Sequence, residues 1–142
     1  MKGKILKALT FLLVLVLSAT ALVACAKPAS AKAEVLAKTD TTVVIRVTEV
    51  TGAAHLIDAM NYLKGENELT FEMSGDLIVS IEGKDCDTVT WSPFWFLYTS
   101  DAEMTNTEWG TVTYLDNVYG SAILGATELE VVVGELYIWE YK

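Results

Sequence analysis

The sequence predicts an α+β domain with a mostly antiparallel sheet and one helix after the first strand. Residues 42–50 (TVVIRVTEV) alternate apolar and polar side chains, which is typical of a strand with one buried face. Residues 53–63 (AAHLIDAMNYL) place Leu56, Met60 and Leu63 with Ala59 on one helical face, and Lys64-Gly65 closes this helix. Strand-like runs follow to the C-terminus. An all-β sandwich without the helix is the alternative.

Five further strands are expected after the helix. The stretches ELTFEM and DLIVSIEG alternate apolar and polar residues, whereas WSPFWFLYT is apolar on both faces. The last of these indicates a central or ligand-facing strand, with Pro93 near its start or at a bulge. In ELEVVVGELYIWEY, two strand-like runs flank Gly134-Glu135, which predicts a hairpin with a type II′ turn. Both faces of the final run are apolar, so one should meet the helix and the other a different element.

The N-terminus has the pattern of a secretory leader. Lys2, Lys4 and Lys7 precede an uncharged stretch over residues 8–26, and the segment Leu-Val-Ala-Cys ending at Cys25 resembles the lipobox of bacterial lipoproteins. We therefore expect a signal peptide at 1–24 and a diacylglyceryl group on Cys25, whose two acyl chains would anchor the protein stably to a membrane. This would place the protein outside the cytoplasm, in the bacterial cell envelope. An uncut membrane anchor, or ordinary cleavage after Ala29-Ser30-Ala31, are the alternatives.

The mature chain is expected to contain a tether and one domain. Residues 25–40 comprise the lipidated cysteine and a small, polar stretch with one proline, which favours a flexible tether, with a short helix over 31–38 as the alternative. Residues 41–142 form the expected domain. Removing the three leader lysines leaves seven basic residues against 19 acidic ones, a balance of −12. Such a charge repels nucleic acid, so no nucleic-acid partner is expected.

Few residues are suited to catalysis or metal binding. The chain has one histidine, His55, for which a solvent-facing or capping role is expected, and no nucleophile or phosphate-loop motif. Cys86 lies between Asp85 and Asp87, which disfavour its thiolate. Neither these acids nor the group Asp101, Glu103 and Asn106 matches an EF-hand. We expect no enzymatic activity, no metal site and no resident cofactor.

The order of elements resembles the DUF4430 family, which is similar to the small C-terminal domain of transcobalamin and intrinsic factor. The segments that carry this resemblance are Val43–Val47, Leu56–Met60, Ile81–Gly83, Trp91–Tyr98 and Val133–Tyr141. The resemblance implies a β-grasp-like fold on a secreted or lipid-anchored bacterial protein, and in the cobalamin carriers this domain caps the corrinoid. The chain departs from the family where Thr99-Ser100-Asp101 replaces the usual Asn-Gly and where Glu135 replaces the usual Asp of the turn. Its segment 100–119 has no counterpart in the family, and the carriers' large helical domain is absent from this sequence.

Aromatic residues crowd the second half of the chain and favour a binding surface, although a sheet core built from aromatic residues is the plainer interpretation. We expect a non-enzymatic, lipid-anchored module that binds a small planar ligand, with a corrinoid as one candidate. The residues expected to contact that ligand are Trp91, Trp95, Tyr98 and Trp139. The alternative is a cell-surface interaction or adhesion module that docks another envelope protein through the same residues.

Overall fold

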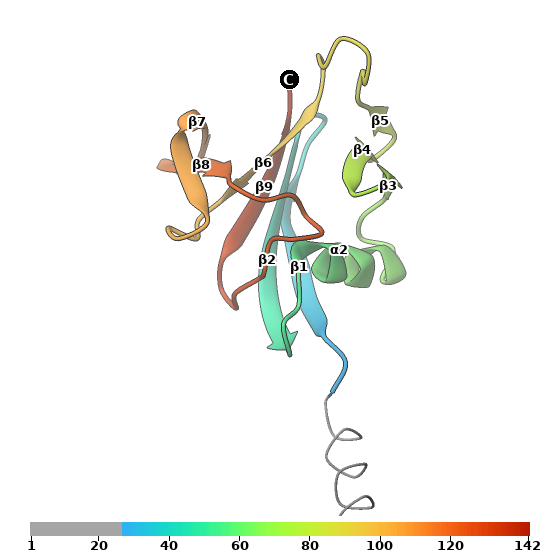
Figure 1. The fold of residues 1–142 in the computed structure, drawn as a ribbon, viewed down its shortest axis with the longest axis vertical. Helices are drawn as coiled ribbons and strands as arrows, with labels where there is room; N and C mark the ends of the chain where they lie inside the picture. Colours follow the sequence, from blue (N-terminus) through green and yellow to red (C-terminus); the bar gives the residue numbers. More distant parts are fainter. Residues whose placement is uncertain (1–26) are drawn as a thin grey trace, which may run out of the picture.

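The computed structural model describes residues 27–142 and shows a six-stranded antiparallel sheet, a small three-stranded sheet and one short helix in that range (Figure 1). The large sheet has the order β1-β2-β9-β6-β8-β7, and the small sheet has the order β3-β4-β5. This confirms the α+β class with a mostly antiparallel sheet. The elements are β1 (Ser30–Lys38), β2 (Thr42–Thr51), α2 (Leu56–Gly65), β3 (Phe71–Ser74), β4 (Leu77–Ile81), β5 (Lys84–Asp85), β6 (Trp95–Thr99), β7 (Thr105–Tyr114), β8 (Asn117–Ala122) and β9 (Leu136–Tyr141).

The helix α2 forms where the apolar spacing predicts it. Its buried residues are Leu56, Ala59, Met60 and Leu63, the same four that the sequence places on one face. His55 is the N-cap residue with an extended backbone, and its N–H donates to the Asp58 carboxylate at 2.8 Å. The helix therefore begins three residues later than expected from Ala53, and His55 has the capping role expected for it.

The strand β1 corrects the prediction of a tether over residues 25–40. From Ser30 onward this segment is an edge strand that pairs with β2, so the domain begins at Ser30 rather than at residue 41, and the helix follows the second strand. Ala31 and Ala33 are buried against the core that includes α2. The alternative of a helix over 31–38 is wrong for the same reason. Small side chains suit this position because they leave room for the helix to approach the sheet.

The predicted C-terminal hairpin is also wrong. The strand β9 pairs with β2 and β6, and not with the run 129–133 before it. That run crosses the start of α2, where Leu56 N–H donates to Leu129 O at 2.9 Å and Val131 N–H donates to Ala54 O at 3.0 Å. Gly134 still lies in a tight turn with a φ of 91°. Leu129 and Val131 are buried in the core with α2, whereas Val132 and Val133 are exposed, so burial against the helix accounts for part of this apolar run and strand pairing for none of it.

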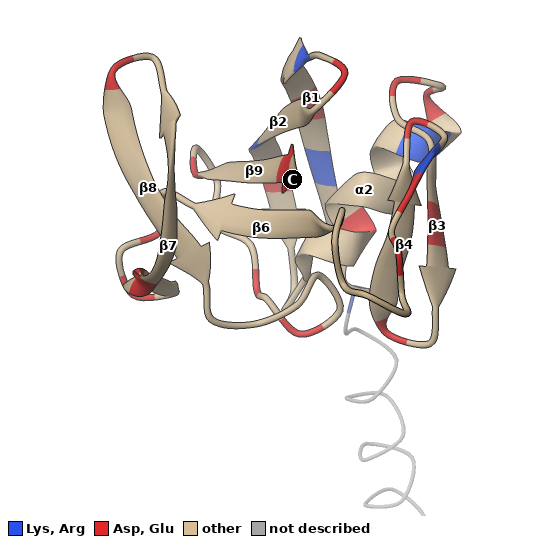
Figure 2. Ribbon diagram, turned by 90° about the horizontal axis from the view of Figure 1, so that it is seen from above, with Lys and Arg blue, Asp and Glu red and all other residues tan. Residues whose placement is uncertain are grey.

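The central strands are covered on both faces, as the two-sided pattern of β9 predicts. On one face Tyr137 and Trp139 pack into the main core with α2 and the small sheet. On the other face Ile138 packs with Val44, Tyr98 and Val112 under the β7–β8 hairpin. Figure 2 shows the hairpin and the helix on opposite sides of β6 and β9, with many of the acidic residues at the turns.

The sequence predicts a signal peptide and a lipid anchor, both of which concern membranes. Within residues 27–142, no helix has the length and apolar character needed to cross a bilayer. The signal peptide at 1–24 and the lipidation of Cys25 fall outside the described residues, and both stay predictions.

The placement of β1 predicts how the domain tolerates truncation. A chain that begins at Ser30 should keep its stability, whereas a chain that begins at Thr39 should lose more than about 3 kcal/mol in free energy of unfolding. The loss would come from the uncovered core around Ala31, Ala33 and Val35 and from the exposure of β2 as a new edge. Urea denaturation of both chains measures this, and equal midpoints would show that β1 does not belong to the folded domain.

Candidate functional site

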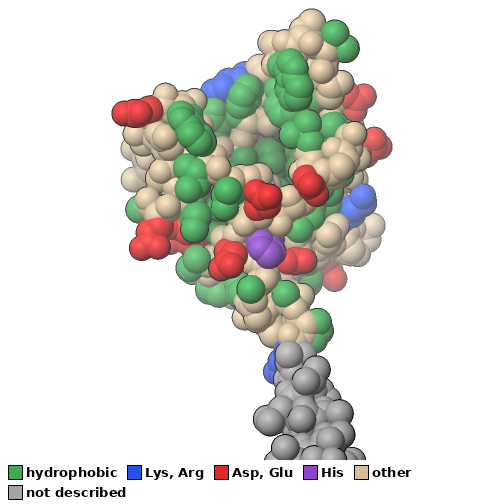
Figure 3. All heavy atoms as spheres, viewed as in Figure 1, with side chains coloured by type: hydrophobic (Ala, Val, Ile, Leu, Met, Phe, Trp, Pro, Cys, Tyr) green, Lys and Arg blue, Asp and Glu red, His purple; other side chains and the backbone are tan. Residues whose placement is uncertain are grey.

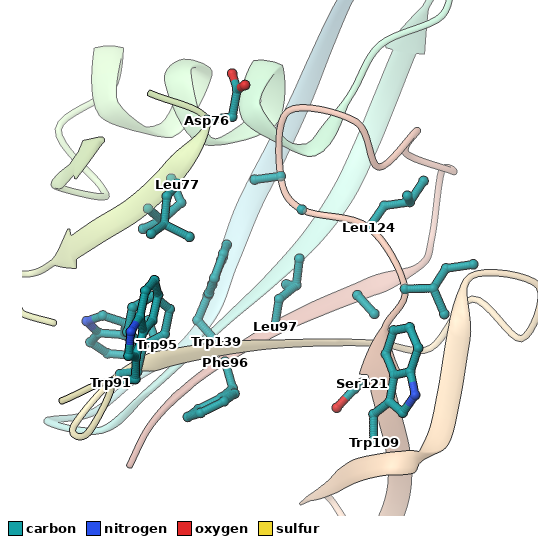
Figure 4. A pocket seen from close by; sticks show the side chains of 16 residues that line it. Asp76, Leu77, Trp91, Trp95, Phe96, Leu97, Trp109, Ser121, Leu124 and Trp139 are labelled. Carbon is teal, nitrogen blue, oxygen red and sulfur yellow. The ribbon is translucent and has the colours of Figure 1, made fainter. Parts of the chain in front are cut away.

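A groove of about 490 Å³ opens between the small sheet and the β7–β8 hairpin. Its floor includes Leu97 on β6 and Trp139 on β9, which are directly paired across these neighbouring strands. Figure 4 shows both side chains rising from the floor, with Leu77 on one side and Leu124 on the other. In the space-filling view the surface is hollowed at this place, and apolar side chains surround the hollow (Figure 3).

One end of the groove is built by the loop between β5 and β6. The Asp87 carboxylate accepts hydrogen bonds from the Val89 and Thr90 N–H groups, at 2.8 and 2.9 Å, and from the Thr90 hydroxyl. The pKa of Asp87 is lowered mainly by the two hydrogen bonds from Thr90. Trp91 N–H donates to the Asp87 carbonyl at 2.8 Å, so this loop holds the Trp91 ring 5.4 Å from the ring of Phe94.

Trp95 lies at the same end of the groove but is buried. Its indole N–H donates to Lys84 O at 2.9 Å, and its ring lies 5.0 Å from that of Tyr141. The Trp95 backbone N–H points to Cys86 Sγ at 3.4 Å. Burial raises the pKa of Cys86, and the charge of Asp85 adds to that shift, against the opposing effect of the Trp95 N–H. The sequence predicted a weakly ionised thiol from the flanking acids, and the structure adds burial as the larger cause.

The opposite wall is the β7–β8 hairpin and the loop that follows it. Trp109 on β7 is 65% exposed and faces the groove beside Ser121 on β8 (Figure 4). The pairing of β7 with β8 shifts register between Asn106 and Thr111, and Gly110 within that irregularity has a φ of 139°. This irregular stretch carries Trp109.

The structure brings together three of the four residues expected to contact a ligand. Trp91, Trp95 and Trp139 line the groove, but Tyr98 does not. Tyr98 is buried on the opposite face of the sheet with Val44 and Ile138, and Lys142 Nζ lies 5.2 Å from its ring. Side chains alternate along β6, so Tyr98 points away from the face that carries Trp95 and Leu97. Its inclusion in the predicted site is therefore wrong.

Sequence reasoning missed Trp109 as a site residue. The residue lies in the segment 100–119, which had no counterpart in the family resemblance, and nothing local to it signals that the hairpin folds beside the groove. With Trp109 included, all four tryptophans of the chain line one groove. The signal in the sequence that could have identified Trp109 is that it is a tryptophan, like the three tryptophans already expected at the site.

The groove has few polar groups. Among residues 27–142, Asp76 is the one ionisable side chain that lines it, and no lysine or arginine of that range does so. Trp139 is 4% exposed, and its indole Nε1 has no hydrogen-bond partner among the described residues. Across residues 27–142, no group of three or more His, Cys, Asp and Glu side chains is placed to hold a metal ion. The arrangement can therefore bind a ligand by apolar contact, ring stacking and a small number of hydrogen bonds.

Comparison with known proteins finds no relative for this chain. It matches no family model, no curated protein and no solved structure. The resemblance to the DUF4430 family therefore rests on the residues quoted for it.

Close packing of β7 against Gly120 on β8 predicts that a larger residue at this position destabilises the hairpin. A Cβ at this position would clash with the Thr105 hydroxyl and lie 3.1 Å from the backbone carbonyl carbon of Asn106. Gly120→Ala should lower the free energy of unfolding by about 1–3 kcal/mol. Gly125→Ala is the matched control, because a Cβ there meets nothing within 4 Å. Equal urea midpoints for the two variants would contradict the close contact between β7 and β8.

Proposed function

We propose that this chain is a lipid-anchored, extracytoplasmic binding module without enzymatic activity, and that the tryptophan-lined groove is its ligand site. The observation that carries the proposal is the gathering of all four tryptophans on one concave surface. The volume of about 490 Å³ falls within the range of ligand sites, roughly 300–1,000 Å³. Exposed large apolar side chains on the groove also favour binding: these are Leu77, Trp91, Phe96, Trp109, Ile123 and Leu124.

A planar ligand suits this groove best. Indole rings bind flat ring systems by stacking or by edge-to-face contact, and the exposed rings of Trp91 and Trp109 come from opposite walls. A corrinoid is the candidate that the DUF4430 resemblance adds. The β-grasp-like assignment belongs to the same proposal, and its support is the order of a β1–β2 hairpin followed by a helix that covers one face of the sheet.

The second candidate function is docking of another envelope protein. The exposed apolar side chains that favour a ligand also favour a protein partner. The concavity of the surface and the small number of polar groups on it favour the small-molecule interpretation over this one.

The position of β1 supports cleavage before Cys25. If the chain were cut after Ala31 instead, Ser30 and Ala31 would be lost from β1, and Ala31 is 5% exposed and paired with Val50. Cleavage before Cys25 leaves β1 whole. Residues 26–29 then join the lipidated cysteine to the fold, and they span at most roughly 14 Å. The domain would therefore be held close to the membrane surface.

The ligand site predicts that tryptophan fluorescence will report binding. Titration with cyanocobalamin, corrected for absorption with N-acetyltryptophanamide, should quench the emission, and Trp109→Ala should weaken binding at least tenfold by removing a stacking surface. Val118→Ala is the control, because Val118 is equally exposed on the same hairpin but does not line the groove. If cyanocobalamin causes no quenching at high micromolar concentration, a corrinoid is not the ligand.

The anchor makes a separate prediction. Radiolabelled palmitate supplied to a bacterial host should enter the wild-type protein and not Cys25→Ala, which has no thiol at that position to acylate. Cys86→Ala is the matched control and should be labelled normally, because Cys86 is part-buried within the domain. Equal labelling of all three chains, or of none, would refute lipidation of Cys25.

A further inference from the structure

The strand β6 has an open edge beside the groove. It pairs with β9 along its whole length from Trp95 to Thr99, but with β8 through Tyr98 and Thr99 alone. The chain leaves β8 after Ala122, and Ile123 N–H turns to donate to Met104 O at 3.0 Å. In the described part of the chain, the edge of β6 at Trp95–Leu97 therefore has no strand partner where it borders the groove.

The backbone groups at this edge follow from the alternation of the ladder. Phe94 and Lys142 exchange both backbone hydrogen bonds, and Ser100 N–H donates to Leu136 O, so the even-numbered residues of this segment bond toward β9. The odd-numbered residues point to the other edge. The Trp95 N–H is taken by Cys86 Sγ. The Leu97 carbonyl lies opposite the Ala122 N–H, because Tyr98 and Ser121 are a non-hydrogen-bonded pair of the β6–β8 ladder. One acceptor, the Trp95 carbonyl, and one donor, the Leu97 N–H, are left at the open edge.

A second donor lies next to this edge. Trp139 is directly opposite Leu97 in the β6–β9 ladder, so the two side chains are neighbours on the groove face. The Trp139 indole N–H is buried and finds no hydrogen-bond partner within residues 27–142. A buried donor in this state gains more from a ligand acceptor than a solvated one does, because it has already lost its hydrogen bond to water.

The charge on the groove limits the ligand further. In the part of the chain that the structure describes, Asp76 is the charged side chain on its lining, and no cationic side chain lines it. The chain as a whole is acidic, with a net charge of −9. An anionic ligand would meet only repulsion there.

We infer that the groove selects an uncharged ligand in which a carboxamide is attached to a planar apolar ring system. The amide oxygen accepts from the Leu97 or Trp139 N–H, and the amide N–H donates to the Trp95 carbonyl, while the rings lie among the indoles. The open edge offers one donor and one acceptor, which suits a single amide group and is too short for a peptide to pair along as a strand. This inference rests on the groove being the ligand site.

Three naphthalene probes that share one ring system test it. Isothermal titration calorimetry of the protein with 2-naphthamide, 2-ethylnaphthalene and 2-naphthoate compares an amide, an apolar group and an anion. We expect 2-naphthamide to bind about tenfold more tightly than 2-ethylnaphthalene, and at least tenfold more tightly than 2-naphthoate. Equal affinities for the amide and the ethyl compound would overturn the inference and leave the groove as a ligand site. Binding of none of the three would overturn both.

The role of the Trp139 indole N–H is tested by the ratio of the affinities for 2-naphthamide and 2-ethylnaphthalene. A substitution that weakens binding of both probes equally leaves this ratio unchanged. In Trp139→Phe the preference for 2-naphthamide over 2-ethylnaphthalene should fall about three- to tenfold. Leu124→Ala, which removes apolar lining without a polar group, should leave that preference unchanged. If Trp139→Phe fails to fold, the preference measured with the wild-type protein decides the inference. An unchanged preference in a folded Trp139→Phe would overturn the assignment of this donor.

Discussion

The pairing of β9 with two neighbours is the constraint on which the rest of the structure depends. This last strand lies between β2 and β6, with Val44 opposite Ile138 on one side and Tyr98 opposite the same residue on the other. A strand in this position must be covered on both faces, and its sequence is apolar on both. Tyr137 shows how tightly its face is covered: the hydroxyl accepts from Val132 N–H at 3.1 Å, and burial raises the pKa of Tyr137 to about 12.

The groove follows from the way these two faces are covered. The β7–β8 hairpin turns over the face that carries Ile138, while α2 and the small sheet cover the face that carries Trp139. β8 keeps contact with β6 for two residues and then departs, so neither layer reaches the floor around Leu97. The same departure leaves the edge of β6 unpaired. The hollow and its backbone hydrogen-bonding groups therefore have one structural cause.

The local pattern of apolar and polar residues was sufficient to predict the elements in which buried and exposed positions recur regularly. It was insufficient for elements whose burial depends on segments distant in the sequence. The four apolar positions of α2 and the alternation in β2 are visible without the fold. β1 is not, because its inward residues Ala31 and Ala33 are too small to mark a buried face. Leu129 and Val131 have the composition of a strand, yet the helix start takes their hydrogen bonds. Of the aromatic residues that the sequence singled out, Trp91, Trp95 and Trp139 lie together on the groove, whereas strand alternation turns Tyr98 to the other face of the sheet, and only the folded hairpin places Trp109.

The four groove tryptophans form a buried pair and an exposed pair, and core packing explains the presence of the buried pair alone. Trp95 and Trp139 are buried, so they fill the core as well as line the groove. Trp91 and Trp109 are 58% and 65% exposed, and each projects from a loop or an irregular strand segment. Core packing therefore explains the first pair and leaves the second pair unexplained. The proposed ligand site would account for both pairs, since the exposed rings complete an apolar surface whose floor the buried rings already form.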